Sequence, residues 1–201
     1  MSDQDSATIR PLAGFGDLHS LPSGAQRRGE PAWAEFERIV ADERDRVARL
    51  ASRLLGWRSD VDDVVQDVFL RAWRGWSGFR QESSVKTWLT RITINACRAR
   101  LRAWSAWLRV FSPADAEEPI RSAAAQDGTG MHAESLRRVR DGVRALPRKL
   151  REVIVLRYLE DYPIAQIAAV LGVSEGAVEV RLHRARARLR DALGALWEQE
   201  R

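Results

Sequence analysis

Residues 159 to 190 constrain the fold of this chain most strongly, because their pattern is that of two short helices joined by a tight turn. A buried stripe on the first helix is predicted by apolar residues at helical spacing, namely Ile164, Ile167, Ala168 and Leu171. Pro163 is tolerated in the first turn of a helix, and Gly172 can adopt the left-handed conformation that ends one. Ser174 is a suitable cap for the helix that follows.

The second predicted helix has two different faces. Its inward face holds the apolar residues Val178, Leu182, Ala185 and Leu189. Another face, at steps of three and four residues, holds Ala177, Arg181, Arg184 and Arg188. This is the pattern of a helix-turn-helix, whose second helix enters the major groove of DNA while its arginines reach phosphates and guanine edges. A solvated arginine-rich helix without a ligand is the alternative, and the spacing of Ala168, Gly172 and Val178 argues against it.

The composition favours a polyanionic partner and argues against several other classes of protein. The 201 residues carry a net charge of +5 at pH 7, which suits nucleic acid. Cys97 is the only cysteine, which excludes a disulfide or a cysteine-based zinc cluster within the chain, and we expect it to be a small apolar residue on a packed helix. Without metal-ligand spacing, a nucleophile–base pair or a glycine-rich phosphate loop, we expect no metal, no cofactor and no enzymatic activity. The sequence lacks a signal peptide and a membrane-spanning run, which predicts a cytoplasmic protein without direct membrane insertion.

The hydrophobic periodicity predicts an all-α protein with two small helical domains joined by a flexible linker. Helical spacing extends almost throughout the first domain and resumes near His132. The segment between them mixes Pro, Ala, Asp and Gly without a hydrophobic stripe. The predicted boundaries are a mobile N-terminal arm at 1–31, a first domain at 32–109, a linker at 110–131 and a second domain at 132–197.

A polar stripe runs along the predicted helix that begins near residue 60. It consists of Asp63, Gln66 and Asp67 with Leu70, and it lies opposite a face of valines. Acids beside an exposed leucine suit a docking surface for a protein partner. An ordinary solvated helix face explains the same pattern, and the residues alone favour that second interpretation.

Residues 83 to 113 contain no acidic residue but six basic ones, namely Lys86, Arg91, Arg98, Arg100, Arg102 and Arg109. Aromatic residues surround the start of this stretch at Trp73, Trp76, Phe79 and Trp88. Cations beside aromatic rings are typical of proteins that bind single-stranded nucleic acid, because bases stack on the rings while phosphates need cations. Alternatively, the rings belong to the core, which we favour for Trp73 and leave open for Phe79 and Trp88.

Two long segments resemble the extracytoplasmic-function (ECF) group of the sigma-70 family of bacterial RNA polymerase sigma factors. Residues 60–102 are similar to region 2 of that group, and residues 145–190 are similar to region 4. The likeness extends from about Ala32 to Leu196, in the order of the family. It implies an alternative sigma factor that binds core RNA polymerase, directs it to specific promoters and helps to start their opening, while the polymerase makes the phosphodiester bonds.

The resemblance also implies roles for individual residues. The clamp helices of the largest polymerase subunit would be bound by Asp63, Gln66 and Asp67. DNA of the −10 element would be bound by Phe79, Lys86, Thr87, Trp88, Arg91, Asn95, Arg98 and Arg102. DNA of the −35 element would be bound by Ser174, Ala177, Glu179, Arg181, His183, Arg184 and Arg188. Besides core polymerase and promoter DNA, the family implies an anti-sigma factor as a partner.

The chain departs from the family pattern at both predicted DNA contacts. Leu89 follows Trp88 where primary sigma factors have a tryptophan pair. One stacking platform is therefore absent, which weakens melting by about 1–3 kcal/mol per stacked base. Glu179 stands where a basic residue is usual. We expect a weaker phosphate contact there and a hydrogen bond from a cytosine amine in its place.

A stand-alone helix-turn-helix regulator is the alternative function, with the N-terminal half as a sensor or dimerisation module. Such a protein binds duplex DNA tightly by itself, as a dimer on a two-fold site. A sigma factor binds weakly by itself and specifically only with polymerase. The acid-free basic stretch beside aromatic residues favours the sigma factor, because a sensor module has no need of it.

Overall fold

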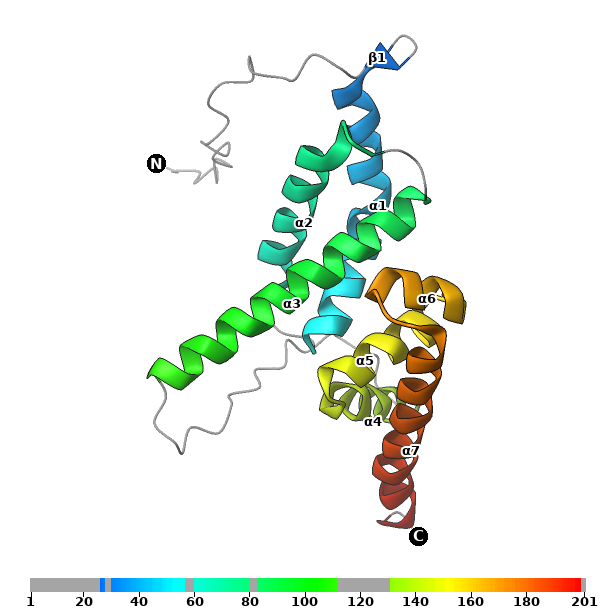
Figure 1. Cartoon of the computed structure of the whole chain (residues 1–201). Coiled ribbons are helices and arrows are strands. Elements are labelled where there is room, and N and C mark those ends of the chain that lie inside the picture. Colours follow the sequence, from blue (N-terminus) through cyan, green and yellow to red (C-terminus); the bar gives the residue numbers. More distant parts are fainter. Residues whose placement is uncertain (1–25, 28–29, 57–59, 80–82, 112–130, 200–201) are drawn as a thin grey trace, which may run out of the picture.

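The computed structural model describes residues 26–27, 30–56, 60–79, 83–111 and 131–199, which fold into two helical domains (Figure 1). The first domain contains α1 (Ala32–Leu55), α2 (Val61–Trp76) and α3 (Val85–Phe111). The second contains α4 (Met131–Ala145), α5 (Arg148–Ile154), the π-helical turn η1 (Val155–Leu159), α6 (Ile164–Leu171) and α7 (Glu175–Gln199). The predicted all-α class with two domains is confirmed.

A pair of two-residue strands precedes α1 and was not predicted. β1 (Gln26–Arg27) pairs with β2 (Glu30–Pro31) in antiparallel orientation. Residues 1–25 of the predicted arm and residues 112–130 of the predicted linker lie outside the described residues. The domain boundaries themselves stay a prediction, although α1 and α4 begin close to them.

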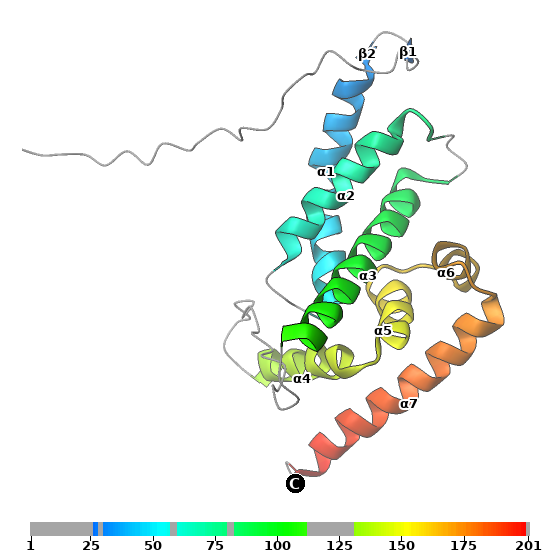
Figure 2. The same ribbon diagram turned by 60° about the vertical axis from the view of Figure 1, so that its left-hand side comes forward.

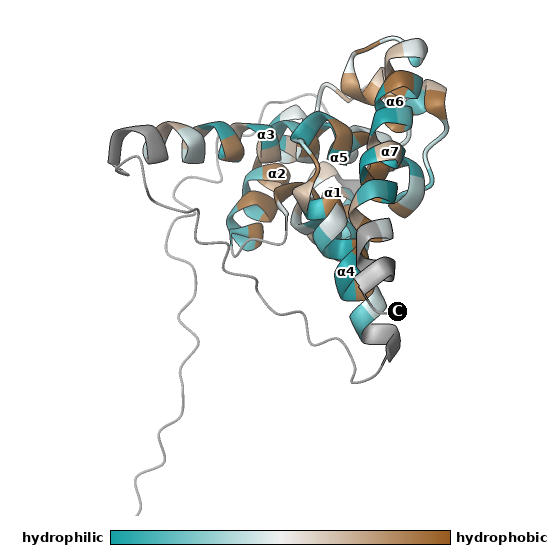
Figure 3. Cartoon of the chain, turned by 90° about the horizontal axis from the view of Figure 1, so that it is seen from below, coloured by the Kyte–Doolittle hydropathy of each residue, from teal (hydrophilic) through white to brown (hydrophobic). Residues whose placement is uncertain are grey.

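The core of the first domain lies between its three helices, each of which packs against the other two. Its fully buried aliphatic residues include Val47, Leu50, Val68, Leu89 and Ile94. The predicted valine face of α2 points into this core, with Val64, Val65, Val68 and Ala72 buried. Figure 3 shows the same amphipathic character, because hydrophobic and hydrophilic residues alternate along the ribbon of α2. Burial stabilises the domain by about 1.5–3 kcal/mol for each large apolar side chain, so the outer faces of α2 and α3 are held in fixed directions.

The predicted helix-turn-helix is confirmed as α6 and α7. Its buried residues include Ile167, Ala168, Leu171, Val178, Leu182 and Ala185. Pro163 occupies the N-cap position of α6, one residue before the first turn in which we predicted it. The preceding π-helical turn was not predicted, and the N–H of Glu160 closes it by donating to the carbonyl of Val155 at 3.1 Å.

The two domains lie against each other, with α6 beside α3 and with α5 and η1 beside α1 (Figures 1 and 2). Gly56, with φ of +76°, follows the end of α1. A Cβ atom there would lie 3.0 Å from Nη1 of Arg151 in α5. The same nitrogen donates a hydrogen bond to the carbonyl of Leu54 at 3.1 Å, so the turn after α1 fits closely against the second domain.

None of the helices in the described ranges combines the length and apolarity that a membrane crossing requires.

Candidate nucleic-acid and protein interfaces

The turn between α6 and α7 sets the direction of the predicted recognition helix. Gly172 ends α6 in the left-handed conformation, with φ of +68°. No heavy atom lies within 4 Å of the place that a Cβ atom would take, so this position requires glycine for its backbone conformation and not for space. The predicted cap is confirmed, because Oγ of Ser174 accepts a hydrogen bond from the N–H of Ala177 at 3.2 Å.

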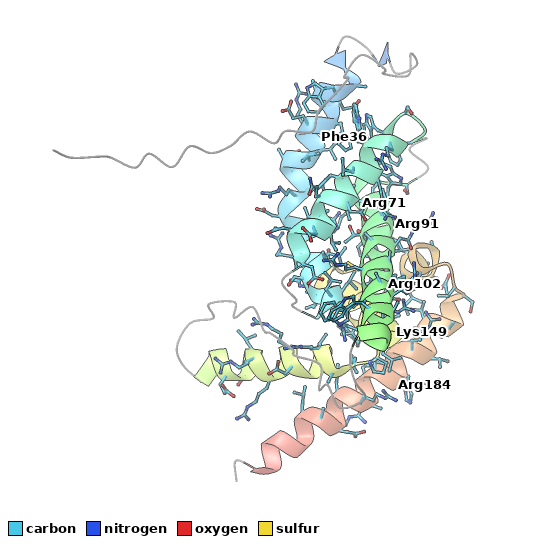
Figure 4. All side chains as sticks on the ribbon, turned by 90° about the vertical axis from the view of Figure 1, so that its left-hand side faces the viewer. Phe36, Arg71, Arg91, Arg102, Lys149 and Arg184 are labelled. Atoms are coloured by element: carbon cyan, nitrogen blue, oxygen red, sulfur yellow. The ribbon has the colours of Figure 1, made fainter. Side chains whose placement is uncertain are left out.

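The predicted −35 residues occupy two flanks of α7 and the turn before it, with Ala177, Arg181, Arg184 and Arg188 on one flank and Glu179 and His183 on another. Together with Ser174 in the turn, we call these residues the recognition face. Its exposed members are Ser174, Glu179, His183, Arg184 and Arg188, and its half-buried members are Ala177 and Arg181. Figure 4 shows Arg184 on the outer side of α7. Within the described ranges, the three arginines of this face form no ion pair. Their guanidinium groups are therefore available to phosphates and base edges.

An aromatic cluster settles the position of the rings that the sequence left open. Phe79 is only 7% exposed, and its ring stacks on that of Trp76 with centroids 5.6 Å apart. The half-buried Trp88 contacts the other side of the cluster, 4.7 Å from Phe79. Trp73 is half-buried against Phe36, 5.1 Å away, in agreement with a core position. Phe79 thus packs within the domain here, and Trp88 is the ring that retains an outer side.

The other predicted −10 residues form one line along α3, at steps of mostly three or four residues. This line, the strand-binding stripe, consists of Lys86, Thr87, Arg91, Asn95, Arg98 and Arg102. Thr87 and Arg98 are half-buried and the other members are exposed. Arg91 and Arg102 mark the direction of the stripe in Figure 4. The spacing places Arg91, Arg98 and Arg102 along a single helix face, as a phosphate backbone would require, while Lys86 lies beside the start of that face.

The second domain occupies part of this stripe. Nε2 of Gln166, on α6, donates a hydrogen bond to Oγ1 of Thr87 at 2.6 Å. Nη2 of Arg91 donates to the carbonyl of Ala169 at 2.7 Å. Ala169 is in the last turn of α6, where carbonyl groups lack helical partners and the helix dipole is negative. Two polar groups of the stripe are therefore satisfied by the chain itself.

Arg98 forms the strongest of these contacts. Its Nε and Nη2 donate to the two carboxylate oxygens of Glu152, on α5, at 2.9 and 2.7 Å. Glu152 is only 3% exposed, and its hydrogen bond raises the pKa of the Arg98 guanidinium. The neighbouring thiol of Cys97 is buried, and this burial, followed by the charge of Glu152, raises its pKa to about 12. Cys97 is thus a packed, protonated residue, as expected.

A second buried acid connects the domains at the end of η1. Glu160 is 7% exposed, and its carboxylate pairs with Arg53 at 3.0 Å and with Arg46 at 3.6 Å, both on α1. Nearby, the hydroxyls of Thr90 and Tyr162 share a hydrogen bond of 2.9 Å. Our sequence interpretation did not single out Glu152 or Glu160. The available signal was an acid at each end of an otherwise largely apolar stretch, where burial requires a cationic partner.

The polar stripe of α2 lies on the surface, as predicted. Asp63 and Gln66 are exposed and Asp67 is half-buried. Asp63 pairs with Arg100 at 3.3 Å, and Asp67 accepts a hydrogen bond from Arg71 at 2.9 Å. The stripe therefore presents carboxylates that are already neutralised in part, which suits a mixed polar partner surface.

Within the part of the chain that the structure describes, no group of three or more His, Cys, Asp or Glu residues is arranged to hold a metal ion.

Two family models match the chain, one in each domain. The model described as Sigma-70 region 2 matches residues 39–107, and that described as Sigma-70, region 4 matches residues 136–189. The ECF RNA polymerase sigma factor SigM of Mycobacterium tuberculosis is 36% identical over 191 residues, which cover 92% of each chain. The RNA polymerase sigma-E factor of Streptomyces avermitilis is 34% identical over 159 residues, covering 79% of this chain and 85% of that protein.

Two solved structures have a similar fold. CnrH in complex with the cytosolic domain of CnrY has a TM-score of 0.57 at 34% identity, covering 81% of this chain and 90% of that chain. The sigma factor RpoE in complex with the anti-sigma factor NepR from Bartonella quintana has a TM-score of 0.67. Its identity of 24%, over 80% of this chain and 97% of that one, supports the fold alone.

Proposed function

The chain belongs to the ECF group of the sigma-70 family and is an alternative sigma factor that directs RNA polymerase to promoters, and we propose that its two domains divide promoter recognition between them. The observation that supports this division most strongly is the pair of family matches in one chain, each on a domain with its own basic helix face. We further propose that the protein acts in the cytoplasm and performs no chemistry itself. The polymerase forms the phosphodiester bonds.

The recognition face is proposed to read the −35 element. The buried side of α7 fixes the helix on α6, so its other side can enter a major groove. Arg181 and Arg184 reach phosphates or guanine edges, and the exposed carboxylate of Glu179 accepts from a cytosine amine. A single such helix contacts only a few base pairs, which explains why a second contact is required.

The strand-binding stripe is proposed to hold the unpaired strand of the −10 element. Trp88 offers its outer side to a base, while the arginines and Lys86 lie along the phosphates. Leu89, which follows it, is fully buried. The chain thus presents one stacking ring there and not two, and promoters with an easily melted −10 element should be used best.

The polar stripe of α2 is proposed to contact the clamp helices of the largest polymerase subunit. Asp63, Gln66 and Asp67 lie on a different helix from the strand-binding stripe, so polymerase and DNA can be bound together. Polymerase then fixes the separation of the two domains, and the second DNA contact becomes intramolecular. Two domains that each bind DNA weakly are sufficient under these conditions.

Transcription from a promoter library with core polymerase tests the proposed function. Adding the protein should create start sites that core polymerase alone does not use. The double substitution Asp63→Ala with Asp67→Ala should weaken capture of core polymerase in a pull-down, while leaving α7 intact. Absence of any new start site would contradict the proposal. Tight, two-fold binding of duplex DNA without polymerase in a gel shift would support the stand-alone regulator instead.

An anti-sigma factor is proposed as a further partner, since the sigma factor RpoE, which has a similar fold, forms a complex with the anti-sigma factor NepR. A groove of about 840 Å³ lies between α1, α4, η1 and α7. Its lining includes the exposed apolar residues Leu136, Val139 and Tyr158, together with Arg49 and Arg186. An apolar floor with arginines around it suits a helix that has one apolar and one acidic face.

A two-hybrid screen of a genomic library with two baits tests this groove. Partners recovered with the wild-type chain should be lost with Val139→Asp, because a charge on the floor opposes apolar contact. The bait Glu134→Gln, changed at an exposed residue of the same helix, should retain them. A partner that binds both baits equally would place the anti-sigma site elsewhere.

A further inference from the structure

We propose that the polymerase-docking surface continues from α2 onto the far end of α3, where the tryptophan pair Trp104 and Trp107 contacts core RNA polymerase. This inference rests on the proposed role of the polar stripe of α2. Asp63 lies at the beginning of that stripe, and Arg100 of α3 forms an ion pair with it at 3.3 Å. We call Arg100, Trp104 and Trp107 the α3 extension.

The α3 extension continues the side of α3 that packs within the first domain. Leu89 and Ala96 are buried on this side, and the three residues of the extension follow Ala96 at steps of four, four and three. Figures 1 and 3 show that α3 runs on away from α1 and α2. Trp104 is half-buried and Trp107 is 51% exposed, with ring centroids 5.5 Å apart. The apolar side of α3 is thus longer than the core that covers it, and large rings reach the surface, which marks a site of protein contact.

Arg100 connects the tryptophan pair to the polar stripe of α2. Its Nε donates a hydrogen bond to Oδ2 of Asp60 at 2.9 Å, and its Nη2 donates to Oδ2 of Asp63 at 3.3 Å. The side chain of Asp60 is 15% exposed, whereas that of Asp63 is 72% exposed. Asp60 precedes α2 but makes no side-chain cap hydrogen bond there, so it serves to anchor the guanidinium group. Arg100 then holds the exposed carboxylate of Asp63 beside α3, as a positioning residue that joins the two helices into one surface.

The charges around the tryptophan pair favour a protein over nucleic acid. The strand-binding stripe lies on the other side of α3, because Arg98 and Arg102 are each two residues from Arg100. On the side of the pair, Arg100 is already held by two carboxylates. The exposed charge of Asp63 also repels a phosphate. Tryptophan and arginine are the residues that contribute most often to the affinity of protein interfaces, so the α3 extension suits a protein partner.

The direction of this surface indicates the shape of the partner. The helices α2 and α3 run in opposite directions (Figure 1), so the direction from Leu70 to Asp63 on α2 is also that from Arg100 to Trp107 on α3. Each of these segments spans seven residues, or about 10 Å. A straight helical element of polymerase, such as the clamp helices, can follow both. It needs a hydrogen-bond donor opposite Asp63 and an apolar side chain about two helical turns further on, over Trp107.

Binding of core polymerase by full-length variants, measured by biolayer interferometry without DNA, tests the α3 extension. Trp107→Ala should weaken binding by at least about fivefold, as expected for a large ring in a protein interface. Trp33→Ala is the matched control, because Trp33 is 50% exposed and also pairs with a tryptophan, Trp73, at 6.0 Å. It should bind like the wild type, with circular dichroism verifying the helical fold of both variants. Equal affinities of Trp107→Ala and the wild type would overturn the inference.

A double-mutant cycle tests Arg100 as a positioning residue. If Arg100 acts by holding Asp63, Asp63→Ala should lower the affinity for core polymerase in the wild-type chain but have little effect in the Arg100→Ala chain. A merely structural role of Arg100 would give additive losses. Additive losses would therefore overturn the link between α2 and the α3 extension.

A photocrosslinker identifies what covers the tryptophan pair. With p-benzoylphenylalanine in place of Trp107, the full-length chain should cross-link to the largest subunit of polymerase. A cross-link only to promoter DNA or to a second copy of the chain would overturn the inference. The proposed docking through α2 fails separately, if Asp63→Ala with Asp67→Ala retains full binding of core polymerase. If that double substitution weakens binding and Trp107→Ala does not, the inference alone is refuted.

Discussion

The arginines of α7 and those of α3 have the same chemistry and the same helical spacing, but they differ in exposure and in their contacts. Arg184 and Arg188 on α7 are exposed and form no ion pair with another described residue. Arg91 and Arg98 on α3 are held by groups of the second domain. The comparison shows that a basic helix face can be exposed or can have its cations held by groups distant in sequence, and that the spacing of the arginines alone does not distinguish the two.

The largest expected effect concerns Arg184→Ala, on the exposed side of this comparison. We expect a decrease of about 5- to 150-fold in the use of promoters that depend on the −35 element, since one arginine contact to a base is worth about 1–3 kcal/mol. Transcription from matched promoters with and without that element measures the effect. Core binding in a pull-down should be unchanged. A loss there would mean that Arg184 supports folding or polymerase contact.

The left-handed backbone conformation in the turn before α7 is tested by Gly172→Ala. With φ at +68°, an alanine should destabilise the second domain by about 1–2 kcal/mol. Urea unfolding measures this loss. Gly176→Ala is the control, because a Cβ atom there also meets no neighbour but the residue lies within α7. It should leave stability equal or higher by about 0.5–1 kcal/mol. Equal losses in the two variants would refute the conformational argument.

The recognition helix could be predicted from the sequence because its signals are local. Gly172, Ser174 and the apolar spacing of α6 and α7 all lie within one short segment, and each has a fixed geometrical consequence. The contacts of α3 with the second domain could not be predicted in this way. Arg98 and Glu152 are 54 residues apart, and only the packing of two domains brings them together.

The aromatic cluster shows the same limit on a smaller scale. The spacing of Phe79 and Trp88 is compatible with a core ring or a base-stacking ring, and burial separates the two. Phe79 lies under Trp88 because α2 and α3 pack closely near Gly75, where a Cβ atom would come within 3.3 Å of the Trp88 ring. Gly75 is the sequence signal for this close approach of α2 and α3. It can be interpreted only when the helix that packs against it is known.

The substitutions Arg102→Ala and Arg98→Ala compare an exposed member of the strand-binding stripe with one that the second domain holds. Arg102→Ala should weaken oligothymidine binding and lower the slope of log affinity against log salt by about 0.7, the value for one phosphate contact with a single strand. Arg98→Ala removes a cation but also releases Glu152, so its affinity should equal or exceed that of the wild type. Arg74→Ala, at an exposed position on α2 outside the stripe, is the control for net charge. An affinity of Arg98→Ala below that of the wild type would show that the contact with Glu152 does not withhold Arg98 from the DNA strand.

The smallest effect concerns the inward side of α3, at Cys97. Its thiol pKa is raised from 9.0 to about 12, so the unfolded chain loses this proton at a lower pH than the folded chain does. The contribution of this thiol to the free energy of unfolding is therefore fully present well below pH 9 and is lost as the pH rises through 9 toward 12, with a loss of about 0.4 kcal/mol at pH 9 and about 1.4 kcal/mol at pH 10. Urea unfolding of the wild type and of Cys97→Ala at pH 7, 9 and 10 isolates this slope. Burial is the larger cause of this pKa shift and the charge of Glu152 the smaller one, so Glu152→Gln should keep most of the pH dependence. A complete loss of the pH dependence in Glu152→Gln would show that the domain contact, and not the core of the first domain, raises the pKa of the Cys97 thiol.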